Sequence, residues 1–112
     1  MDSVRQNKVA RLLQKELAKL FQVESRNILP GKMITVTVVR VTPDLGLAKV
    51  YLSIFPHSPE EDLLGPINEH GKMLRSTLGN TIRHQVRIIP ELAFYIDDSM
   101  DYVEKIEKLL KK

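Results

Sequence analysis

Residues 72–98 read KMLRSTLGNTIRHQVRIIPELAFYIDD, and this stretch decides both the fold and the candidate binding site. Its first eighteen residues contain no acidic side chain but four basic ones, which are Lys72, Arg75, Arg83 and Arg87. An apolar run follows Pro90 and ends in two aspartates. A helix with unopposed positive charge that leads into a buried strand is suited to hold a polyanion against a sheet, and phosphate backbones are the commonest polyanion.

The length and composition predict a single folded domain spanning residues 1–112. A hydrophobic content of 43% can fill one core, and 28% charged residues of mixed sign are typical of a folded protein. The net charge of +3 is unevenly distributed. Residues 1–32 and 72–89 each carry +4, whereas residues 33–71 carry −3 and residues 90–112 carry −2. Two basic blocks separated by acidic ones indicate a polyanionic partner more strongly than the total does.

Several classes of protein are disfavoured by what the chain lacks. It has no cysteine, which excludes disulfides, thiolate metal sites and a cysteine nucleophile. No catalytic signature motif and no phosphate-binding glycine loop is present, so neither an enzyme, a cofactor nor a metal is expected. The charged N-terminus has no apolar signal segment, and no run approaches the ~20 apolar residues of a membrane span. We therefore expect a cytoplasmic protein that does not contact membranes.

The first predicted helix covers residues 3–23 and should end before Pro30-Gly31. Its apolar residues fall within one arc at helical spacing and should face the core: Val9, Leu13, Leu17, Leu20 and Phe21. Basic residues form a stripe almost opposite: Arg5, Lys8, Arg11, Lys15 and Lys19. The helix is therefore amphipathic, with a positively charged outer face.

Two strands are predicted next, at residues 33–41 and 47–54. The intervening Thr42-Pro43-Asp44-Leu45-Gly46 has turn chemistry, so the strands should form an antiparallel hairpin. In the second strand the alternation predicts one buried face, formed by Ala48, Val50, Leu52 and Ile54.

The second half of the chain predicts two helices, a strand and a last helix. Ser58-Pro59-Glu60-Glu61 has capping-box spacing with proline at the first helical position, and Gly65-Pro66 should interrupt this helix. A second helical stretch from about residue 66 to 83 places its cations on the face beside its apolar residues. A strand at residues 92–96 and a short helix at residues 100–110, or 100–112 with its charged end, complete the order.

Several pieces of this sequence resemble the ribosome-binding factor A family, from the first helix to about Ser99. The matching pieces are residues 37–41 (TVVRV), 44–45 (DL), 48–53 (AKVYLS), 74–79 (LRSTLG), 87–94 (RIIPELAF) and 97–99 (DDS). No single piece is diagnostic, but their order and spacing together are specific.

The resemblance implies an α+β fold of the type-II K-homology-like kind, with a three-stranded sheet and helices on one face. It also implies a non-enzymatic factor that binds the small (30S) ribosomal subunit and its precursor 16S ribosomal RNA. Such a factor promotes rRNA processing and subunit maturation, and family members are linked to growth in the cold. We expect a monomer that binds free or immature small subunits.

One departure from K-homology domains concerns the RNA-clamping loop. Those domains use a Gly-x-x-Gly loop, and the five glycines of this chain include no such pair. The family resemblance implies a helix kink marked Ala-x-Gly instead, and the corresponding residues here are His70-Gly71-Lys72. The glycine stands one residue early and the alanine is missing. We still expect a kink, because glycine lowers the cost of leaving a helix.

The candidate RNA-binding residues are the cations of the two basic blocks and one histidine: Lys8, Arg11, Lys15, Lys72, Arg75, Arg83, His84 and Arg87. Each has a plainer interpretation. The stripe on the first helix could be an ordinary solvated face, and His84 an ordinary surface histidine. Arg75 could instead form a salt bridge with an acid at 60–62 or 97–98.

The aromatic and acidic residues also leave alternatives open. Tyr51, Phe94 and Tyr95 could form a stacking platform on the sheet or could fill the core. Alternation allows either Phe94 or Tyr95 to point inward. Asp97-Asp98-Ser99 is better interpreted as a strand end leading into a capped helix than as a metal site. A rival function is a protein–protein adaptor that docks through the hairpin edge and the acidic loop at residues 60–62.

Overall fold

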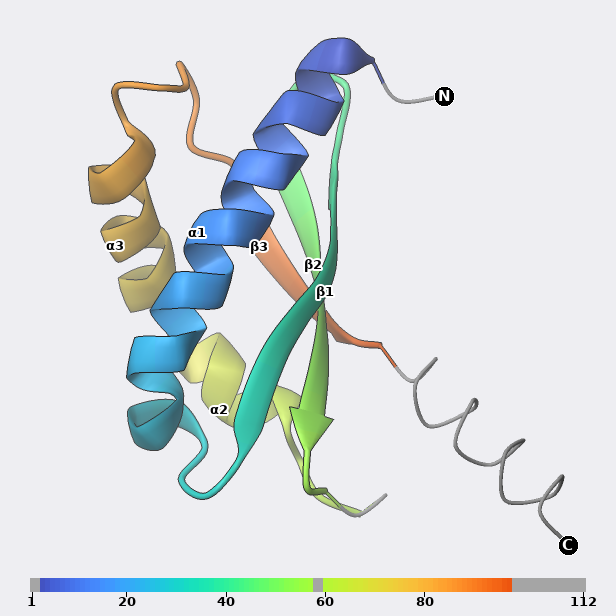
Figure 1. Ribbon diagram of the computed structural model, residues 1–112, viewed down its shortest axis with the longest axis vertical. Coiled ribbons are helices and arrows are strands. Elements are labelled where there is room, and N and C mark those ends of the chain that lie inside the picture. Colours follow the sequence, from blue (N-terminus) through green and yellow to red (C-terminus); the bar gives the residue numbers. More distant parts are fainter. Residues whose placement is uncertain (1–2, 58–59, 98–112) are drawn as a thin grey trace, which may run out of the picture.

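The computed structural model of the protein describes residues 3–57 and 60–97 (Figure 1). Its elements are α1 (Val4–Ile28), β1 (Met33–Val41), β2 (Leu47–Phe55), α2 (Leu64–Glu69), α3 (Gly71–Ile82) and β3 (Glu91–Ile96). The predicted order of helix, two strands, two helices and a strand is therefore confirmed. The helix predicted at residues 100–112 lies outside the described residues.

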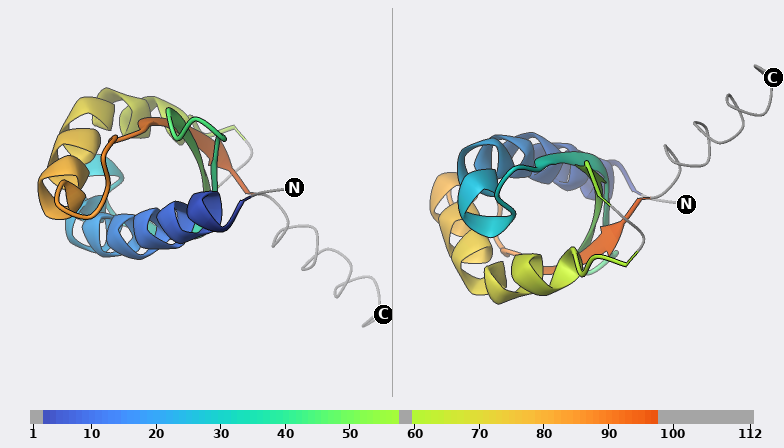
Figure 2. Two further views of the ribbon diagram at one scale, coloured as in Figure 1. Left: turned by 90° about the horizontal axis from the view of Figure 1, so that it is seen from above. Right: turned by 90° about the horizontal axis from the view of Figure 1, so that it is seen from below.

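The three strands form one mixed sheet in the order β1-β2-β3. Strands β1 and β2 are antiparallel, whereas β2 and β3 are parallel. The helices cover one face of this sheet, and in the views along the long axis the sheet and the helices lie on opposite sides of the core (Figure 2). The predicted α+β fold, with helices on one face of a three-stranded sheet, is confirmed. No helix in the part of the chain that the structure describes is long and apolar enough to cross a membrane.

Helix α1 begins with a capping box, a feature beyond the predicted helix start at residue 3. The Ser3 hydroxyl accepts a hydrogen bond from the Gln6 backbone N–H, and the Gln6 side chain accepts one from the Ser3 N–H. The predicted apolar stripe is buried, apart from a half-buried Leu20. The helix extends past the predicted end at Val23 to Ile28, because Ile28 continues the buried stripe two turns after Phe21. Pro30 and Gly31 then form a tight turn.

A β-bulge at Thr37 divides β1 into two halves with opposite alternation. Ile34 and Val36 are buried before the bulge, whereas Val39 and Val41 are buried after it. Helix α1 stabilises this edge strand with two glutamines. Gln14 Nε2 donates to the Thr37 carbonyl at 3.1 Å, and the buried Gln6 donates to the Val41 carbonyl at 2.8 Å.

Strands β2 and β3 follow the predicted alternation. The buried face of β2 is formed by the four residues predicted for it: Ala48, Val50, Leu52 and Ile54. In β3, Phe94 points inward and packs edge-on against Phe21, with ring centroids 6.0 Å apart. Tyr95 points outward and is 41% exposed. Of the two orientations that the sequence allowed, the structure therefore selects Phe94 in the core.

The helix predicted to start at Pro59 is wrong in its start and in its break. Residues 60–63 lie in turns and irregular backbone, and α2 begins at Leu64, so that Gly65-Pro66 lies inside its first turn. Proline is tolerated there, because the first-turn N–H groups have no intrahelical partner. The Asp62 carboxylate accepts the Gly65 N–H at 2.9 Å, and a Cβ at position 65 would collide with that carboxylate.

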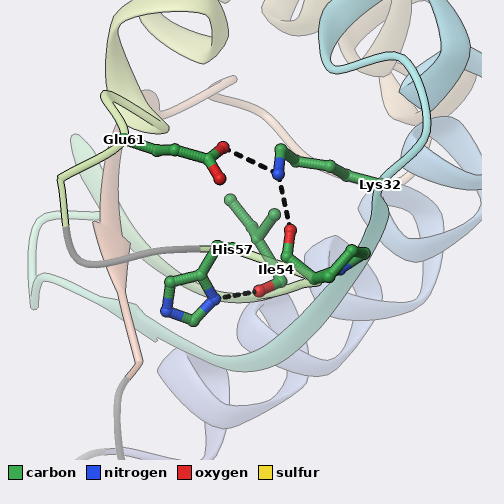
Figure 3. A network of polar contacts seen from close by, with 5 residues as sticks. Lys32, Ile54, His57 and Glu61 are labelled. Carbon is green, nitrogen blue, oxygen red and sulfur yellow. Dashed lines mark hydrogen bonds and ion pairs between the residues drawn. The ribbon is translucent and has the colours of Figure 1, made fainter.

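Lys32 connects three segments at one end of the hairpin (Figure 3). Its Nζ donates to the Pro56 carbonyl at 2.6 Å and forms a 2.7 Å ion pair with Glu61. His57 Nδ1 lies 2.7 Å from the Ile54 carbonyl in the same region. The Lys32 side chain is only 17% exposed, so its charge is largely withdrawn from water and is compensated by these two partners.

We expect Lys32→Met to lower the free energy of unfolding by about 1–2 kcal/mol, because the charge-assisted bond and the ion pair are lost together. Urea denaturation measures this change. Lys19→Met is the matched control, since Lys19 is well exposed and its ion pair with Glu16 is longer, at 3.6 Å. This variant should change stability by less than about 0.5 kcal/mol. Equal stability of the two variants would contradict the role given to Lys32.

The hairpin turn is stabilised by Asp44, as its turn chemistry predicted. Asp44 Oδ1 accepts from the Thr42 hydroxyl at 2.7 Å and from the Gly46 N–H at 3.0 Å. Leu45 takes a left-handed backbone conformation, with φ of 61°, and its side chain is buried. The Thr42 hydroxyl, followed by the Gly46 N–H, lowers the pKa of the Asp44 carboxyl below its ordinary value of 3.8.

A lowered pKa in the folded state means that the unfolded chain takes up the proton first as the pH falls. The contribution of Asp44 is therefore complete above the ordinary pKa of 3.8 and is lost as the pH falls through the lower folded pKa. We expect Asp44→Asn to lower the melting temperature at neutral pH, and the difference from the wild type to shrink below 3.8. Thermal melts followed by circular dichroism at the two pH values test this; a constant difference would contradict it.

Candidate nucleic-acid interface

A groove of about 1070 Å³ runs between α3 and the segment that leads into β3. It is lined by the end of α2, one face of α3, residues 87–89 and part of β3. All four cations of the acid-free stretch line it: Lys72, Arg75, Arg83 and Arg87. The structure therefore brings together the four cations that were singled out in the opening stretch.

Helical spacing explains why the cations of α3 share this groove. Leu74, Leu78 and Ile82 are buried at intervals of four residues and fix the rotation of the helix. Lys72 and Arg75 then fall on the flank that faces β3, together with Arg83 at the helix end. Within the described residues, Lys72, Arg83 and Arg87 take part in no ion pair, and all three are exposed. Their charges are therefore accessible to an anion in the groove.

Arg75 differs from the other three cations because its guanidinium is used to hold the fold. Its Nε donates to the Pro90 carbonyl at 3.0 Å and its Nη2 to the Ile89 carbonyl at 2.7 Å. It also lies 3.7 Å from Glu91. The salt bridge considered for Arg75 does form, but its partner is Glu91 and not one of the predicted acids at 60–62 or Asp97; Asp98 lies outside the described residues. Glu91 is nearer because β3 enters the sheet directly beside α3.

Two glycines form part of the groove lining. A Cβ at Gly71 would meet no atom within 4 Å, and one at Gly79 would meet Ile89 Cγ1 at 3.5 Å, which is ordinary contact. Neither glycine has a positive φ. The fold would therefore accept alanine at both positions. At Gly79, which lies in the interior of α3, alanine would also remove the penalty of about 0.5–1 kcal/mol that glycine imposes in a helix. Their visible effect is to leave helix backbone open to the groove.

The expected kink at His70-Gly71-Lys72 is confirmed, with His70 at its centre. Helix α2 ends at Glu69, His70 leaves helical geometry at φ −92° and ψ 5°, and α3 starts at Gly71. His70 Nδ1 lies 2.8 Å from the Pro66 carbonyl, which also accepts the His70 backbone N–H at 3.3 Å, so the imidazole adds a second partner to this helix-end acceptor. The missing alanine of the family pattern therefore does not prevent the break.

The other predicted binding residues lie outside the groove. Lys8, Arg11 and Lys15 are exposed on α1, whose flank with Glu16 and Lys19 borders the opposite side of α3, at Thr77 and Thr81. His84 is exposed in the turn after α3 and does not line the groove. The α1 stripe thus forms a second basic surface across α3 from the groove.

Sequence reasoning missed the uncharged polar residues of the groove. Asn68, Ser76 and Asn80 line it with the cations, and Glu91 is the acid at its edge. Ser76 and Asn80 follow Lys72 at intervals of four residues, so the same helical spacing that grouped the cations could have identified them.

The mixed sheet, the helices on one face and the basic groove beside the parallel strand define an α+β fold compatible with the type-II K-homology-like class. A sequence model described as ribosome-binding factor A matches residues 5–110. The chain belongs to the ribosome-binding factor A family.

Curated relatives support this assignment over the whole chain. Ribosome-binding factor A of Cytophaga hutchinsonii is 50% identical over 112 residues, which cover all of this chain and 84% of the relative. The Chlorobaculum tepidum protein of the same name is 44% identical over 112 residues, covering 97% of this chain and 90% of the relative.

A crystal structure and a fitted homology model show the same fold at lower identity. The crystal structure of ribosome-binding factor A from Thermus thermophilus superposes with a TM-score of 0.68 at 24% identity, covering 81% of this chain and 94% of that one. A homology model of the Thermus thermophilus factor, fitted into a cryo-electron microscopy map of its complex with 30S, gives a TM-score of 0.61 at 24% identity. It covers 78% of this chain and 89% of that one.

We expect Arg75→Ala to destabilise the fold by about 2 kcal/mol, because two backbone carbonyls lose a charged donor. Lys72→Ala, on the same groove wall but without an ion pair in the described residues, should change stability by less than about 0.5 kcal/mol. Denaturant midpoints of the two variants measure the difference. Comparable midpoints would show that Arg75 does not hold the strand entrance.

Proposed function

We propose that the protein is a non-enzymatic assembly factor that binds the small (30S) ribosomal subunit and its precursor 16S ribosomal RNA, and that it promotes rRNA processing and subunit maturation. The family assignment supports the ribosomal partner. The observation that carries the proposal for RNA is the groove. Three exposed cations line it, together with helix backbone that two glycines leave uncovered. The site of action would be the cytoplasm, with the protein acting as a monomer.

Phosphate contacts from Lys72, Arg83 and Arg87 would supply the affinity in this mechanism. Arginine offers a planar fork to phosphate, and each neutralised phosphate releases condensed counterions. Arg75 contributes field rather than direct contact, because its donors already serve the Ile89 and Pro90 carbonyls. The α1 stripe of Lys8, Arg11 and Lys15 would add long-range attraction from across α3.

Shape rather than base identity would set the specificity. Side chains cannot read the deep, narrow major groove of A-form RNA, whereas a fixed groove can select a strand that fits it. The groove is fixed on the α3 side by the buried apolar stripe of that helix. On the β3 side it is fixed by Arg75, which binds the Ile89 and Pro90 carbonyls. Such a site would stabilise one conformation of an RNA segment until maturation removes it.

The adaptor alternative loses support because acidic residues of its proposed docking loop already have partners within the chain. Glu61 is paired with Lys32 at 2.7 Å, and Asp62 accepts the Gly65 N–H at the start of α2. Two of the three acids at residues 60–62 therefore stabilise the chain's own structure. A negligible salt dependence of binding to small subunits would nevertheless favour an adaptor.

The groove is tested by replacing Lys72, Arg83 and Arg87 with alanine together. We expect weaker binding to immature small subunits and a salt slope (log K against log [salt]) smaller by about 2, as three lost single-strand phosphate contacts predict. Sedimentation with small subunits and titration of single-stranded rRNA fragments over a range of salt measure the two effects.

The control removes the same charge from Lys8, Arg11 and Lys15. This triple variant should lose less affinity, because those cations lie on an exposed helix face outside the groove. If both triple variants lose affinity equally, binding depends on net charge and the groove has no special role. Unchanged sedimentation of the groove variant would contradict the proposed function itself.

A further inference from the structure

The outer face of the sheet, which points away from the helices, has an aromatic pair at its centre. Tyr51 in β2 and Tyr95 in β3 are register partners, and their rings stack with centroids 5.3 Å apart and planes at 25°. Val38 of β1 is the register partner of Tyr51 on the other side and is 37% exposed. A row of three apolar or aromatic side chains thus crosses all three strands on the face opposite the core.

Two cations form the next row on the same face. Arg40 and Lys49 are direct register partners and both are exposed. Like charges placed directly opposite each other in an antiparallel pair destabilise the sheet. Neither cation forms an ion pair with any residue that the structure describes. A bound anion would relieve this repulsion, so the charge of this row is complementary to a phosphate.

The spacing of the two rows suits a nucleotide. Successive residues on one face of a strand are about 6.6 Å apart, since each residue advances about 3.3 Å. A base in contact with the tyrosine row would therefore have its phosphate within reach of Arg40 and Lys49. Aromatic rings accept any base, because every base has a stacking face, and a basic track beside them is the usual arrangement for single strands.

We propose that the outer sheet face is a second RNA-binding surface, on which Tyr51 and Tyr95 stack unpaired bases while Arg40 and Lys49 hold the adjoining phosphates. This surface is distinct from the groove, which lies on the helix side of β3. The inference rests on the proposed function, because it assumes that the partner is RNA. Duplex RNA would not bind there in the same way, since its bases are already stacked and paired.

The test compares Tyr95→Ala with Tyr95→Phe in the full chain, using a short fluorescent oligoribonucleotide, single-stranded or annealed to its complement. Tyr95→Ala should weaken single-strand binding by about fivefold or more, and Tyr95→Phe should stay within about twofold, because the ring is kept. Affinity for the duplex should be unchanged in both. Lys49→Ala should reduce the single-strand salt slope by about 0.7.

Tyrosine fluorescence gives a second readout that does not depend on the alanine variant folding. The chain has three tyrosines and no tryptophan, so stacking on Tyr51 and Tyr95 should quench much of the protein's emission. Unlabelled single strands should quench the tyrosine emission of the wild type. A Tyr51→Phe/Tyr95→Phe variant keeps the emission of one tyrosine, and single strands should leave that emission unchanged. Saturating RNA without quenching of the wild type would overturn the inference.

The two proposals fail in different ways. If the groove variant loses single-strand binding but Tyr95→Ala keeps it within about twofold, the proposed function stands and the outer face is not an RNA surface. If neither variant loses binding, both proposals are wrong. If Tyr95→Ala changes self-association but not RNA affinity, the face is a contact between copies, and the inference is overturned.

Discussion

The bulge at Thr37 is the constraint on which both faces of the sheet depend. One extra residue in β1 reverses the alternation, so that Val39 and Val41 enter the core and Arg40 faces outward. Without it, regular alternation from Ile34 and Val36 would direct Arg40 inward. The bulge is held from two directions: Gln14 of α1 donates to the Thr37 carbonyl, and the Thr37 hydroxyl donates to Asp97 at 2.6 Å. These two hydrogen bonds hold the bulge in place, and the bulge determines which side chains of β1 enter the core.

The hydrogen bond between Thr37 and Asp97 also positions β3, the strand that borders the candidate groove. At its exit, Asp97 binds the Thr37 hydroxyl and its N–H donates to the Leu52 carbonyl. At its entrance, Arg75 holds the Ile89 and Pro90 carbonyls. A parallel edge strand has no hairpin partner to set its position, so fixation at both ends replaces that local constraint. One of the four groove cations is consequently a structural residue, and the remaining three carry the accessible charge.

The elements with a clear apolar period were predictable, and those governed by single polar contacts were not. The β2 alternation and the α1 stripe specify their own burial, and the acid-free run of α3 predicts a basic face that proves to be one wall of the groove. The start of α2 was missed because the capping-box spacing at residue 58 predicted an earlier start, whereas the side-chain contact at the actual start is the Asp62 carboxylate that accepts the Gly65 N–H. The Arg75 partners were missed because they are backbone carbonyls, which have no sequence signature. The Val38-Val39 pair was an available sign of the bulge.

The alternation of β3 gives one short strand a share in both candidate surfaces. Leu92 and Phe94 face the groove side, whereas Ala93 and Tyr95 face outward. Because β3 is the edge strand of the sheet in the part of the chain that the structure describes, no further described strand separates the groove from the outer face. Helix α3, on the other side of the groove, has Gly79 in its interior, although alanine would fit there and would stabilise the helix. A residue that lowers stability where the fold does not require it is expected at a binding site. Here the glycine keeps the groove open beside β3, the strand that links the two surfaces.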